Sequence, residues 1–371
     1  MKRIYIAIIV LLVIISLPIL LWFLAPQKQL NVAIIDKTVP NDLYREHQGL
    51  VWALNHLKYE KLNNEEYELT DYFGTKPKDH KVESISLPQD YSDFDVIYLA
   101  DSYGVYEEDL KASSKRFGAR SEKIIGGLEL REWNQIARRL LSEEKSLFIA
   151  EFNSFASPTP PETKNAMLEF LGLNWEGWVG RYFTELDYEK NNEIPSWIVE
   201  RFQENWNYEG GGFILVNDFS SEVVVLELNH HISEAGIRLE YTQEGQSLFG
   251  KSPRTNYEYW FDIITSDSED TVLANYKWSL TEKGEKLLTE KSIPLSFSAV
   301  VKNERGNADM YYFAGDYNDV GQLPKFYQAK GLGAFYKVGQ KFSDDAFYWS
   351  TYLPMMNSIL KNYHAKLHSA K

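Results

Sequence analysis

An uncharged apolar run opens the chain. Residues 4–24 read IYIAIIVLLVIISLPILLWFL. At 1.5 Å of rise per residue, a helix of this length spans roughly 30 Å, the hydrocarbon thickness of a bilayer. Lys2 and Arg3 precede the run, and the positive-inside bias then keeps the N-terminus cytoplasmic. The pattern predicts an N-terminal transmembrane anchor over residues 1–27, in contact with the lipid bilayer through residues 4–24.

A cleaved signal peptide is the alternative to an anchor. Its apolar region is shorter, and it ends at small residues in the A-x-A manner. The only candidate here is Phe23-Leu24-Ala25, in which a bulky Phe takes the place of a small residue. The sequence therefore favours a single-pass signal-anchor in the cell membrane, with one extracytoplasmic domain over residues 28–371.

Beyond the anchor, buried-strand patterns alternate with helical patterns. Apolar β-branched runs occur at LNVAIID (30–36), DVIYLAD (95–101) and SLFIAEF (146–152), as in parallel strands covered on both faces. Helical spacing of apolar residues follows at 45–57, 129–141 and 160–172. We also expect a short strand at 67–72 and a charged, Ser-rich loop at 111–126. This alternation predicts an α/β fold with a mostly parallel sheet flanked by helices.

The pattern changes from about residue 177 onward. GGGFILVNDF, EVVVLEL, IRLEYTQ and YEYWFDIIT are strand-like, and the last two alternate as antiparallel strands do. They predict an antiparallel β-rich insertion at about 184–255. Later runs, DTVLANY, PLSFSAVV and DMYYFAGD, predict further strands, and a final amphipathic helix lies around Pro354.

Composition removes several classes of function. The chain has 53 acidic and 39 basic side chains and a net charge of −14, so it repels phosphate backbones and we expect no nucleic-acid partner. It has no cysteine, which excludes thiol nucleophiles, disulfides, thiolate zinc sites and iron–sulfur clusters. Aromatic residues reach 15%, enough either to fill a core or to line a surface that stacks on sugar rings.

Four acidic residues stand at or near the carboxyl ends of predicted strands, namely Asp36, Asp101, Glu151 and Asp316. Ligands of open parallel sheets bind at these ends. If the strands are neighbours, the acids converge and could supply a general acid–base pair or bind a divalent cation. They could equally cap loops and helices. The catalytic candidates are Asp101, Glu151 and Asp316.

The ligand-binding candidates come from the same strand ends and from one later segment: Asp36, Glu46, His47, Asn153 and Arg181. Glu46 and His47 follow the first strand, and Asn153 follows the third. Arg181 could present its guanidinium to a sugar or a carboxylate, or form a structural ion pair.

No metal site and no cofactor are predicted. His230 and His231 are adjacent, so on a strand they point to opposite faces, and the chain has no HExxH motif. A serine nucleophile at Ser154 lacks the G-x-S-x-G frame, because Phe152 and Ala156 occupy the flanking positions.

The order of elements resembles a known fold. NVAIID, DVIYLAD, SLFIAEFNSF, TVLANY and ADMYYFAGDYND follow one another in a way that is similar to the class I glutamine amidotransferase-like, flavodoxin-related superfamily. A late strand in that group often ends in an aromatic-Gly-Asp pattern like the one at Phe313–Asp316. The resemblance covers most of residues 30–320, in pattern only.

The departure from the family concerns its nucleophile. Active amidotransferases carry a Cys in a strand-to-helix elbow, followed later by His and Glu. The matching elbow here is Ala150-Glu151-Phe152-Asn153, without a Cys. The resemblance therefore implies a degenerate member that does not run glutaminase chemistry.

Three hypotheses for function follow. The first is a non-amidotransferase ectodomain that binds a small or glycan-type ligand in an envelope-associated role. The second is a carboxylate-based hydrolase of extracellular polysaccharide, which needs two acids about 5 to 9 Å apart. The third is a structural partner in a membrane complex, recognised by a large exposed apolar patch. The sequence does not decide between an enzyme and a binding protein, and it predicts no particular protein partner.

Overall fold

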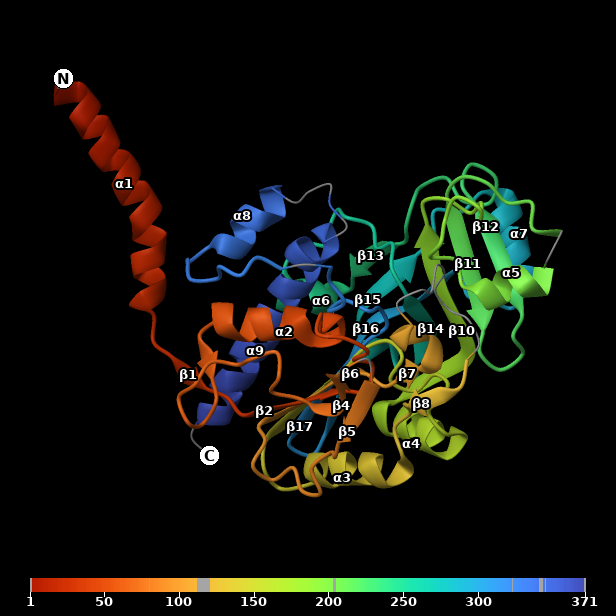
Figure 1. The fold of residues 1–371 in the computed structure, drawn as a ribbon, viewed down its shortest axis with the longest axis horizontal. Coiled ribbons are helices and arrows are strands. Elements are labelled where there is room, and N and C mark those ends of the chain that lie inside the picture. Colours follow the sequence, from red (N-terminus) through yellow and green to blue (C-terminus); the bar gives the residue numbers. More distant parts are fainter. Residues whose placement is uncertain are drawn as a thin grey trace.

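A large mixed sheet, covered by helices, forms the globular part of the molecule, and one long helix projects from it (Figure 1). The computed structural model describes residues 2–79, 81–111, 121–202, 205–321, 323–339, 343 and 345–369. The projecting helix is α1 (Lys2–Phe23). The α/β class and the N-terminal apolar helix are confirmed.

The parallel part of the sheet has the spatial order β4–β2–β6–β9–β17. Its bounds are Phe73–Lys78 for β4, Val32–Asp36 for β2, Val96–Asp101 for β6, Ser146–Ala150 for β9 and Ala308–Phe313 for β17. Every residue of β2, β6, β9 and β17 is buried. Burial on both faces explains why these strands are continuous apolar runs in the sequence.

Helices cover both faces of the parallel part. α2 (Arg45–His56) and α9 (Leu353–His368) pack together on one face, and α3 (Leu130–Leu140) and α4 (Pro161–Leu171) pack together on the other (Figure 1). Trp133 of α3 contacts Phe148 of β9 and Phe170 of α4. The amphipathic patterns at 45–57, 129–141 and 160–172 therefore correspond to real helices, because each buries one face against the sheet.

The antiparallel part continues the same sheet from β17 through β16 (Ser296–Arg305), β14 (Phe261–Ser266) and β10 (Leu173–Phe183) to β11 (Gly212–Asn217) and β12 (Val223–Glu227). β15 (Val272–Lys277) pairs with β16 and with β13 (Arg238–Tyr241). β5 (Lys81–Ile85) pairs with β4 at the opposite edge. The domain limits 28–371 and 184–255 remain predictions.

Short elements complete the described residues. They are the pairs β1 (Lys28–Gln29) with β3 (Tyr59–Glu60) and β7 (Val105–Tyr106) with β8 (Lys123–Ile125), and the helices α5 (Ser196–Phe202), α6 (Gln243–Phe249), α7 (Glu282–Glu290) and α8 (Leu332–Gly339). Residues 112–120 of the expected loop at 111–126 lie outside the described residues, and the loop prediction is wrong for Lys123–Ile125, which form β8.

The expected strand at 67–72 is wrong. That segment is irregular, and the strand β4 begins at Phe73. The Asn55 side chain bonds both the backbone NH and the carbonyl of Tyr67, with distances of 2.9 and 2.8 Å. Because a buried asparagine takes these two backbone groups, they are not available to a sheet partner.

The C-terminal end of α1 is attached to the globular part. Trp22 is only 4% exposed, and its indole NH donates to the His56 carbonyl at 2.9 Å. The Lys58 ammonium lies 4.0 Å from the centroid of the Trp22 ring. Among the described residues, Arg3–Phe23 is the one helix that is long and apolar enough to cross a membrane.

Candidate functional site

The four strand-end acids lie at the carboxyl ends of four neighbouring strands. Asp36 ends β2, Asp101 ends β6, Glu151 follows β9 and Asp316 follows β17. β2, β6, β9 and β17 are parallel neighbours in this order. The acids therefore gather at the edge where open parallel sheets bind ligands.

Asp36 is paired with His47 of α2. The His47 Nδ1 lies 2.6 Å from Asp36 Oδ2, and both side chains are fully buried. The other ring nitrogen, Nε2, faces the Leu69 carbonyl at 2.9 Å and must carry a hydrogen to donate there. Both nitrogens of His47 are occupied inside the protein, so the pair fixes α2 to β2.

Asp101 is held by three donors. Its Oδ1 accepts hydrogen bonds from the Thr38 hydroxyl and from the Tyr103 NH, and its Oδ2 accepts one from the Asn153 amide at 3.2 Å. Burial raises the pKa of Asp101 to about 7, against the opposing effect of these donors. Asn153 adopts a positive φ of 64° in the loop after β9, which brings its amide to Asp101.

Glu151 is buried beneath this edge. Its Oε1 accepts from the Tyr98 hydroxyl, which lies 2.8 Å from the Tyr352 hydroxyl, and its Oε2 accepts from the Asn318 NH at 3.2 Å. Burial raises the pKa of Glu151 to about 8. With both oxygens bonded internally, Glu151 connects the core to the loop after β17.

Asp316 belongs to a different group, which we call the acidic trio: Glu46, Asp316 and Asp319. Oxygen atoms of the three carboxyl groups all lie within 4.8 Å of one another. Burial raises the pKa of Glu46 and of Asp316 well above the ordinary value, and the charge of Asp319 adds to both effects. Three acids so close together cannot all be ionised unless a cation balances their charge. Without a cation, at least one of them holds a proton.

Arg45 partly balances the acidic trio. Its Nε and Nη2 donate to the two oxygens of Asp319, at 2.7 and 3.0 Å, in a bidentate pair. Burial raises the pKa of Asp319, and Arg45 opposes this rise. Glu46 has no such partner among the described residues, since its Oε2 is buried and makes no hydrogen bond with any of them. An unsatisfied buried oxygen at the rim of a sheet is a group available to a ligand.

Two aromatic side chains and one arginine lie next to the acidic trio. We call Arg181, Tyr259 and Trp260 the aromatic rim. The Arg181 guanidinium lies 4.5 Å from the Tyr259 ring centroid and 5.8 Å from that of Trp260. The Tyr259 hydroxyl lies 3.5 Å from Arg45 Nη2, which joins the rim to the acidic trio. All three rim residues are half-buried, so they contribute surface as well as core.

The structure separates the residues that were predicted together. Glu46 and Asp316 belong to the acidic trio and Arg181 to the adjoining aromatic rim, whereas Asp36, His47, Asp101 and Glu151 are held in internal hydrogen bonds. Asp319 and Tyr259 were missed. Asp319 stands in the same segment as Asp316, DYND, and the repeated acid could have drawn notice; nothing local indicates Tyr259.

Asn318 was also missed, although it organises the site. Its side-chain amide donates to the Glu46 carbonyl at 2.7 Å, and its side-chain oxygen accepts from the Leu50 NH at 2.6 Å. With its backbone NH on Glu151, Asn318 holds the first turn of α2 against the loop after β17. Glu46 is thereby fixed beside Asp316.

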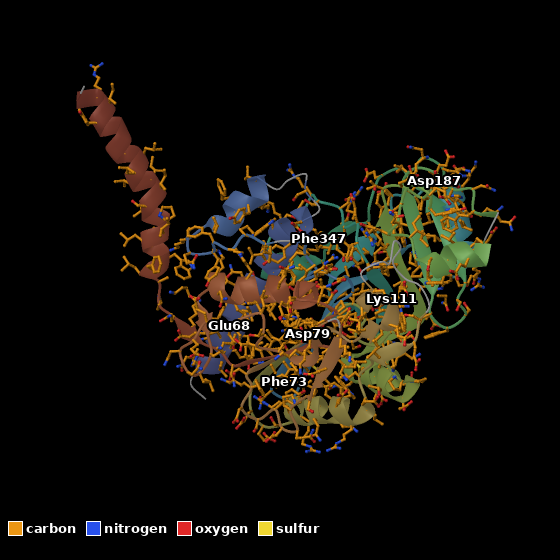
Figure 2. The ribbon with its side chains drawn as sticks, viewed as in Figure 1. Glu68, Phe73, Asp79, Lys111, Asp187 and Phe347 are labelled. Atoms are coloured by element: carbon orange, nitrogen blue, oxygen red, sulfur yellow. The ribbon has the colours of Figure 1, made fainter. Side chains whose placement is uncertain are left out.

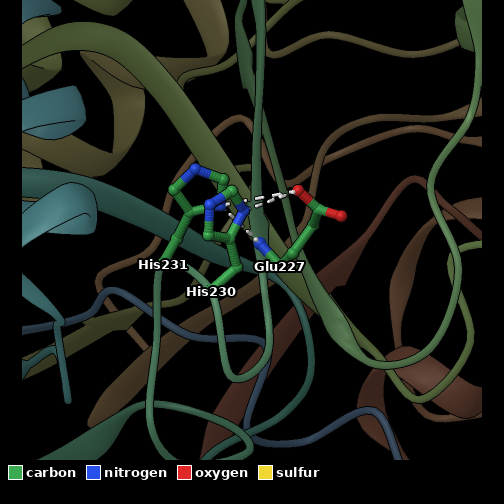
Figure 3. A group of neighbouring side chains, drawn as sticks. All are labelled: Glu227, His230 and His231. Carbon is green, nitrogen blue, oxygen red and sulfur yellow. Dashed lines mark hydrogen bonds and ion pairs between the residues drawn. The ribbon is translucent and has the colours of Figure 1, made fainter.

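Two other candidate groups are occupied in ordinary ways. The Ser154 hydroxyl is buried and donates to the Glu151 carbonyl. Figure 3 shows Glu227, His230 and His231 close together. The Lys283 ammonium lies 3.0 Å from His230 Nε2, and the Glu227 NH donates to His231 Nδ1 at 3.1 Å. These bonds use lone pairs that a metal ion would need.

A cavity of about 780 Å³ lies away from the strand ends. It is formed between α2, the segment before β4 and residues 323–327, with Trp52, Lys61, Glu68, Asp71 and Tyr327 among its lining; Glu68 is labelled in Figure 2. The acidic trio contributes no residue to its lining.

Comparison with known proteins gives weak likenesses. No protein family and no curated protein matches the sequence. Among solved structures, a β-galactosidase from Rahnella sp. R3 has a TM-score of 0.36 and 12% identity, over 84% of this chain and 31% of the enzyme. A β-galactosidase from Bacillus circulans sp. alkalophilus has a TM-score of 0.34 and 11% identity, over 78% of this chain and 30% of the enzyme.

The carbohydrate deacetylase Agd3 has a TM-score of 0.28 and 10% identity, over 78% of this chain and 30% of that one. The chain spans less than a third of each of these three proteins. Likenesses of this size assign the chain neither a fold family nor an activity.

Proposed function

We propose that this protein is a membrane-anchored binding protein whose extracytoplasmic domain takes a glycan or another polyhydroxylated small ligand at the acidic trio and aromatic rim. The observation that carries the proposal is the buried, unbonded Oε2 of Glu46 beside Asp316 and the bidentate Arg45–Asp319 pair. Carboxyl oxygens accept hydrogen bonds from sugar hydroxyls, and aromatic faces such as Tyr259 and Trp260 stack on sugar rings.

The anchor is part of the same proposal. The burial of Trp22 and its bond to His56 support a helix that stays attached to the globular part rather than one that is removed. Lys2 and Arg3 before the helix support a cytoplasmic N-terminus and an outer globular domain.

The family assignment is proposed as well. We infer a degenerate, amidotransferase-like domain, on the order of its strands and helices and on the elbow at 150–153, which holds Glu151 in place of a nucleophilic Cys. This assignment concerns fold alone, and the binding function is argued from the acidic trio.

Thermal unfolding of the purified protein against a panel of glycans tests the proposal. A ligand of the folded state at about a hundredfold excess over its dissociation constant adds about 2.7 kcal/mol of stability. We expect Glu46→Ala to abolish that gain because the acceptor is removed. Glu46→Gln should retain it, since the pKa of Glu46 is raised by burial and Gln resembles the neutral acid.

Exposed Glu189 supplies the matched control, and Glu189→Gln should respond to glycans as the wild-type protein does. If no glycan stabilises the wild type, or if Glu46→Ala is stabilised equally, the binding proposal is wrong. The first of these outcomes would favour the structural partner of a membrane complex.

A carboxylate-based polysaccharide hydrolase is the second candidate. It is favoured by the environments of two neighbouring acids: burial raises the pKa of Glu46 well above the ordinary value, as a general acid requires, and it also raises the pKa of Asp319, where Arg45 opposes the rise. Oxygen atoms of Glu46 and Asp319 lie within 4.8 Å of each other. This is closer than the about 6.5–9.5 Å between the carboxyl groups of inverting enzymes, so the pair does not fit an inverting mechanism.

The same variants distinguish hydrolysis from binding. A hydrolase would lose turnover of a glycoside in Glu46→Gln, because Gln cannot donate a proton, while that variant still bound the substrate. If the wild-type protein binds a glycan but does not hydrolyse a glycoside, the hydrolase candidate is wrong and the binding function remains.

A further inference from the structure

The segment at residues 323–339 differs in charge from the rest of the molecule. It contains Lys325, Lys330 and Lys337 and no acidic residue, in a chain whose net charge is −14. Four aromatic residues are interleaved with the lysines, namely Phe326, Tyr327, Phe335 and Tyr336. Basic and aromatic residues in alternation are typical of segments that lie at a membrane interface.

The helix of this segment, α8, is apolar on two faces. Its inner face packs on the globular part, with the Tyr336 ring 4.5 Å from that of Trp349. Its outer face presents Phe335 and Val338, which are 70% and 78% exposed. These two residues are three positions apart and therefore share a face. An exposed apolar helix face needs a covering surface.

The transmembrane helix lies beside this segment. The Lys330 NH donates to the Pro18 carbonyl of α1 at 3.0 Å, and the Tyr327 ring lies 6.0 Å from that of Trp22. Pro18 precedes the end of α1 at Phe23 by about 7.5 Å at 1.5 Å per residue. The contact is therefore at the depth of the outer bilayer interface, where interfacial helices bury their apolar faces about 5–10 Å.

Figure 1 shows α8 on the side of the globular part from which α1 projects, with α3 on the opposite face of the sheet. We propose that α8 is a second membrane contact: it lies in the outer lipid interface next to α1, with Phe335 and Val338 among the lipids and Lys337 facing anionic headgroups. The occupant of this face is the lipid surface itself. The inference rests on α1 crossing the membrane and is independent of the ligand at the acidic trio.

Single-cysteine labelling tests this placement, and the chain offers no background because it has no cysteine. Val338→Cys, Ile14→Cys and Leu141→Cys are each made in the full chain, labelled with an environment-sensitive fluorophore and reconstituted in vesicles of phosphatidylcholine and phosphatidylglycerol. Ile14 lies mid-way in α1, and Leu141, 64% exposed, follows α3. The quenchers are nitroxide lipids labelled at the headgroup or deep in the acyl chain.

We expect the Val338 label to be quenched severalfold more by the headgroup nitroxide than the Leu141 label, and the Ile14 label to be quenched by the deep nitroxide. Phe335→Asp in the Val338→Cys background should remove the quenching. If the Val338 label resembles the Leu141 label while Ile14 is quenched, α8 faces water or a protein and the proposal is overturned. If Ile14 is not quenched, the anchor proposal fails and this one fails with it.

Discussion

At the scale of single residues, hydrogen-bond satisfaction separates acids that look equivalent in the sequence. Asp36, Asp101 and Glu151 all end buried strands, and all accept hydrogen bonds from neighbouring protein groups. Glu46 retains a buried oxygen without a partner. The site that we propose therefore keeps Asp316 from the strand-end acids and adds Glu46 from the first turn of α2, because an incompletely bonded group can gain a partner from a ligand.

Glu151→Gln is expected to flatten the pH dependence of stability. Burial raises the pKa of Glu151 from 4.5 to about 8, so between these values the folded protein holds a proton that the unfolded chain releases. The stabilisation is complete below about pH 4.5 and is lost as the pH rises through about 8. Gln keeps the shape of the protonated acid. Between about pH 5 and pH 8, the free energy of unfolding of the variant should therefore fall by at least about 1 kcal/mol less than that of the wild type.

Urea unfolding at the two pH values measures this difference. Asp101, whose pKa burial raises to about 7, gives a further fall that Glu151→Gln leaves in place. Glu189→Gln, at an exposed site, should fall as the wild type does. Equal falls for wild type and Glu151→Gln would show that Glu151 does not titrate in this range.

At the scale of elements, α2 connects the sheet to the site. Its first three residues turn to different partners, since successive helical positions point in different directions. Arg45 pairs with Asp319, Glu46 joins the acidic trio and His47 pairs with Asp36. The position of this one helix therefore decides whether the site forms.

Gly49 of α2 should not tolerate a side chain. A Cβ there would lie 2.4 Å from Asn318 Oδ1 and 2.8 Å from Tyr348 Cε2. We expect Gly49→Ala to lower the free energy of unfolding by about 1–3 kcal/mol, because overpacking outweighs the gain of about 1 kcal/mol in helix propensity. Glycan binding should weaken in parallel, since Asn318 holds Glu46 in place.

Gly339 of α8 is the matched control. No atom of the described residues, apart from its chain neighbours and the backbone of α8, lies within 4 Å of a Cβ built at that position, so Gly339→Ala should leave stability within about 0.5 kcal/mol of the wild type. Urea unfolding of both variants is the measurement. A Gly49→Ala protein as stable as Gly339→Ala would mean that α2 can move away from Asn318 without cost.

At the scale of the whole molecule, the apolar helix α1 and the globular part meet at a defined contact. Trp22 of α1 is buried, and its indole NH donates to the carbonyl of His56 at the end of α2. The Lys330 NH donates to the Pro18 carbonyl of α1. These contacts come from segments far apart in the chain, so the anchor that we propose would hold the domain close to the bilayer rather than on a free tether. The proposed outer orientation follows from Lys2 and Arg3.

Cysteine accessibility in intact cells measures the orientation. Lys286 of α7 has a side chain that is 79% exposed, so Lys286→Cys in this cysteine-free chain should react with a membrane-impermeant maleimide before the cells are permeabilised. Val13→Cys, inside α1, should stay unlabelled in both conditions. Labelling of Lys286→Cys only after permeabilisation would reverse the proposed topology.

The sequence by itself determined the features that depend on neighbouring residues. An uncharged run of membrane length gave α1, and continuous apolar runs gave β2, β6 and β9, because burial on all sides leaves no place for a polar residue. The strand-end acids could also be located, since each stands at the end of its strand or within three residues of it. The segment at 67–72 was misjudged because the Asn55 side chain, distant in sequence, takes its backbone bonds.

Only the tertiary structure decided which acids meet. Glu46 comes from α2, Asp316 and Asp319 from the loop after β17, and Tyr259 from the approach to β14. Their meeting depends on the strand order and on Asn318, which fastens α2 to that loop. Spacing along the chain carries no record of such contacts, because each is made between segments that lie far apart in the sequence.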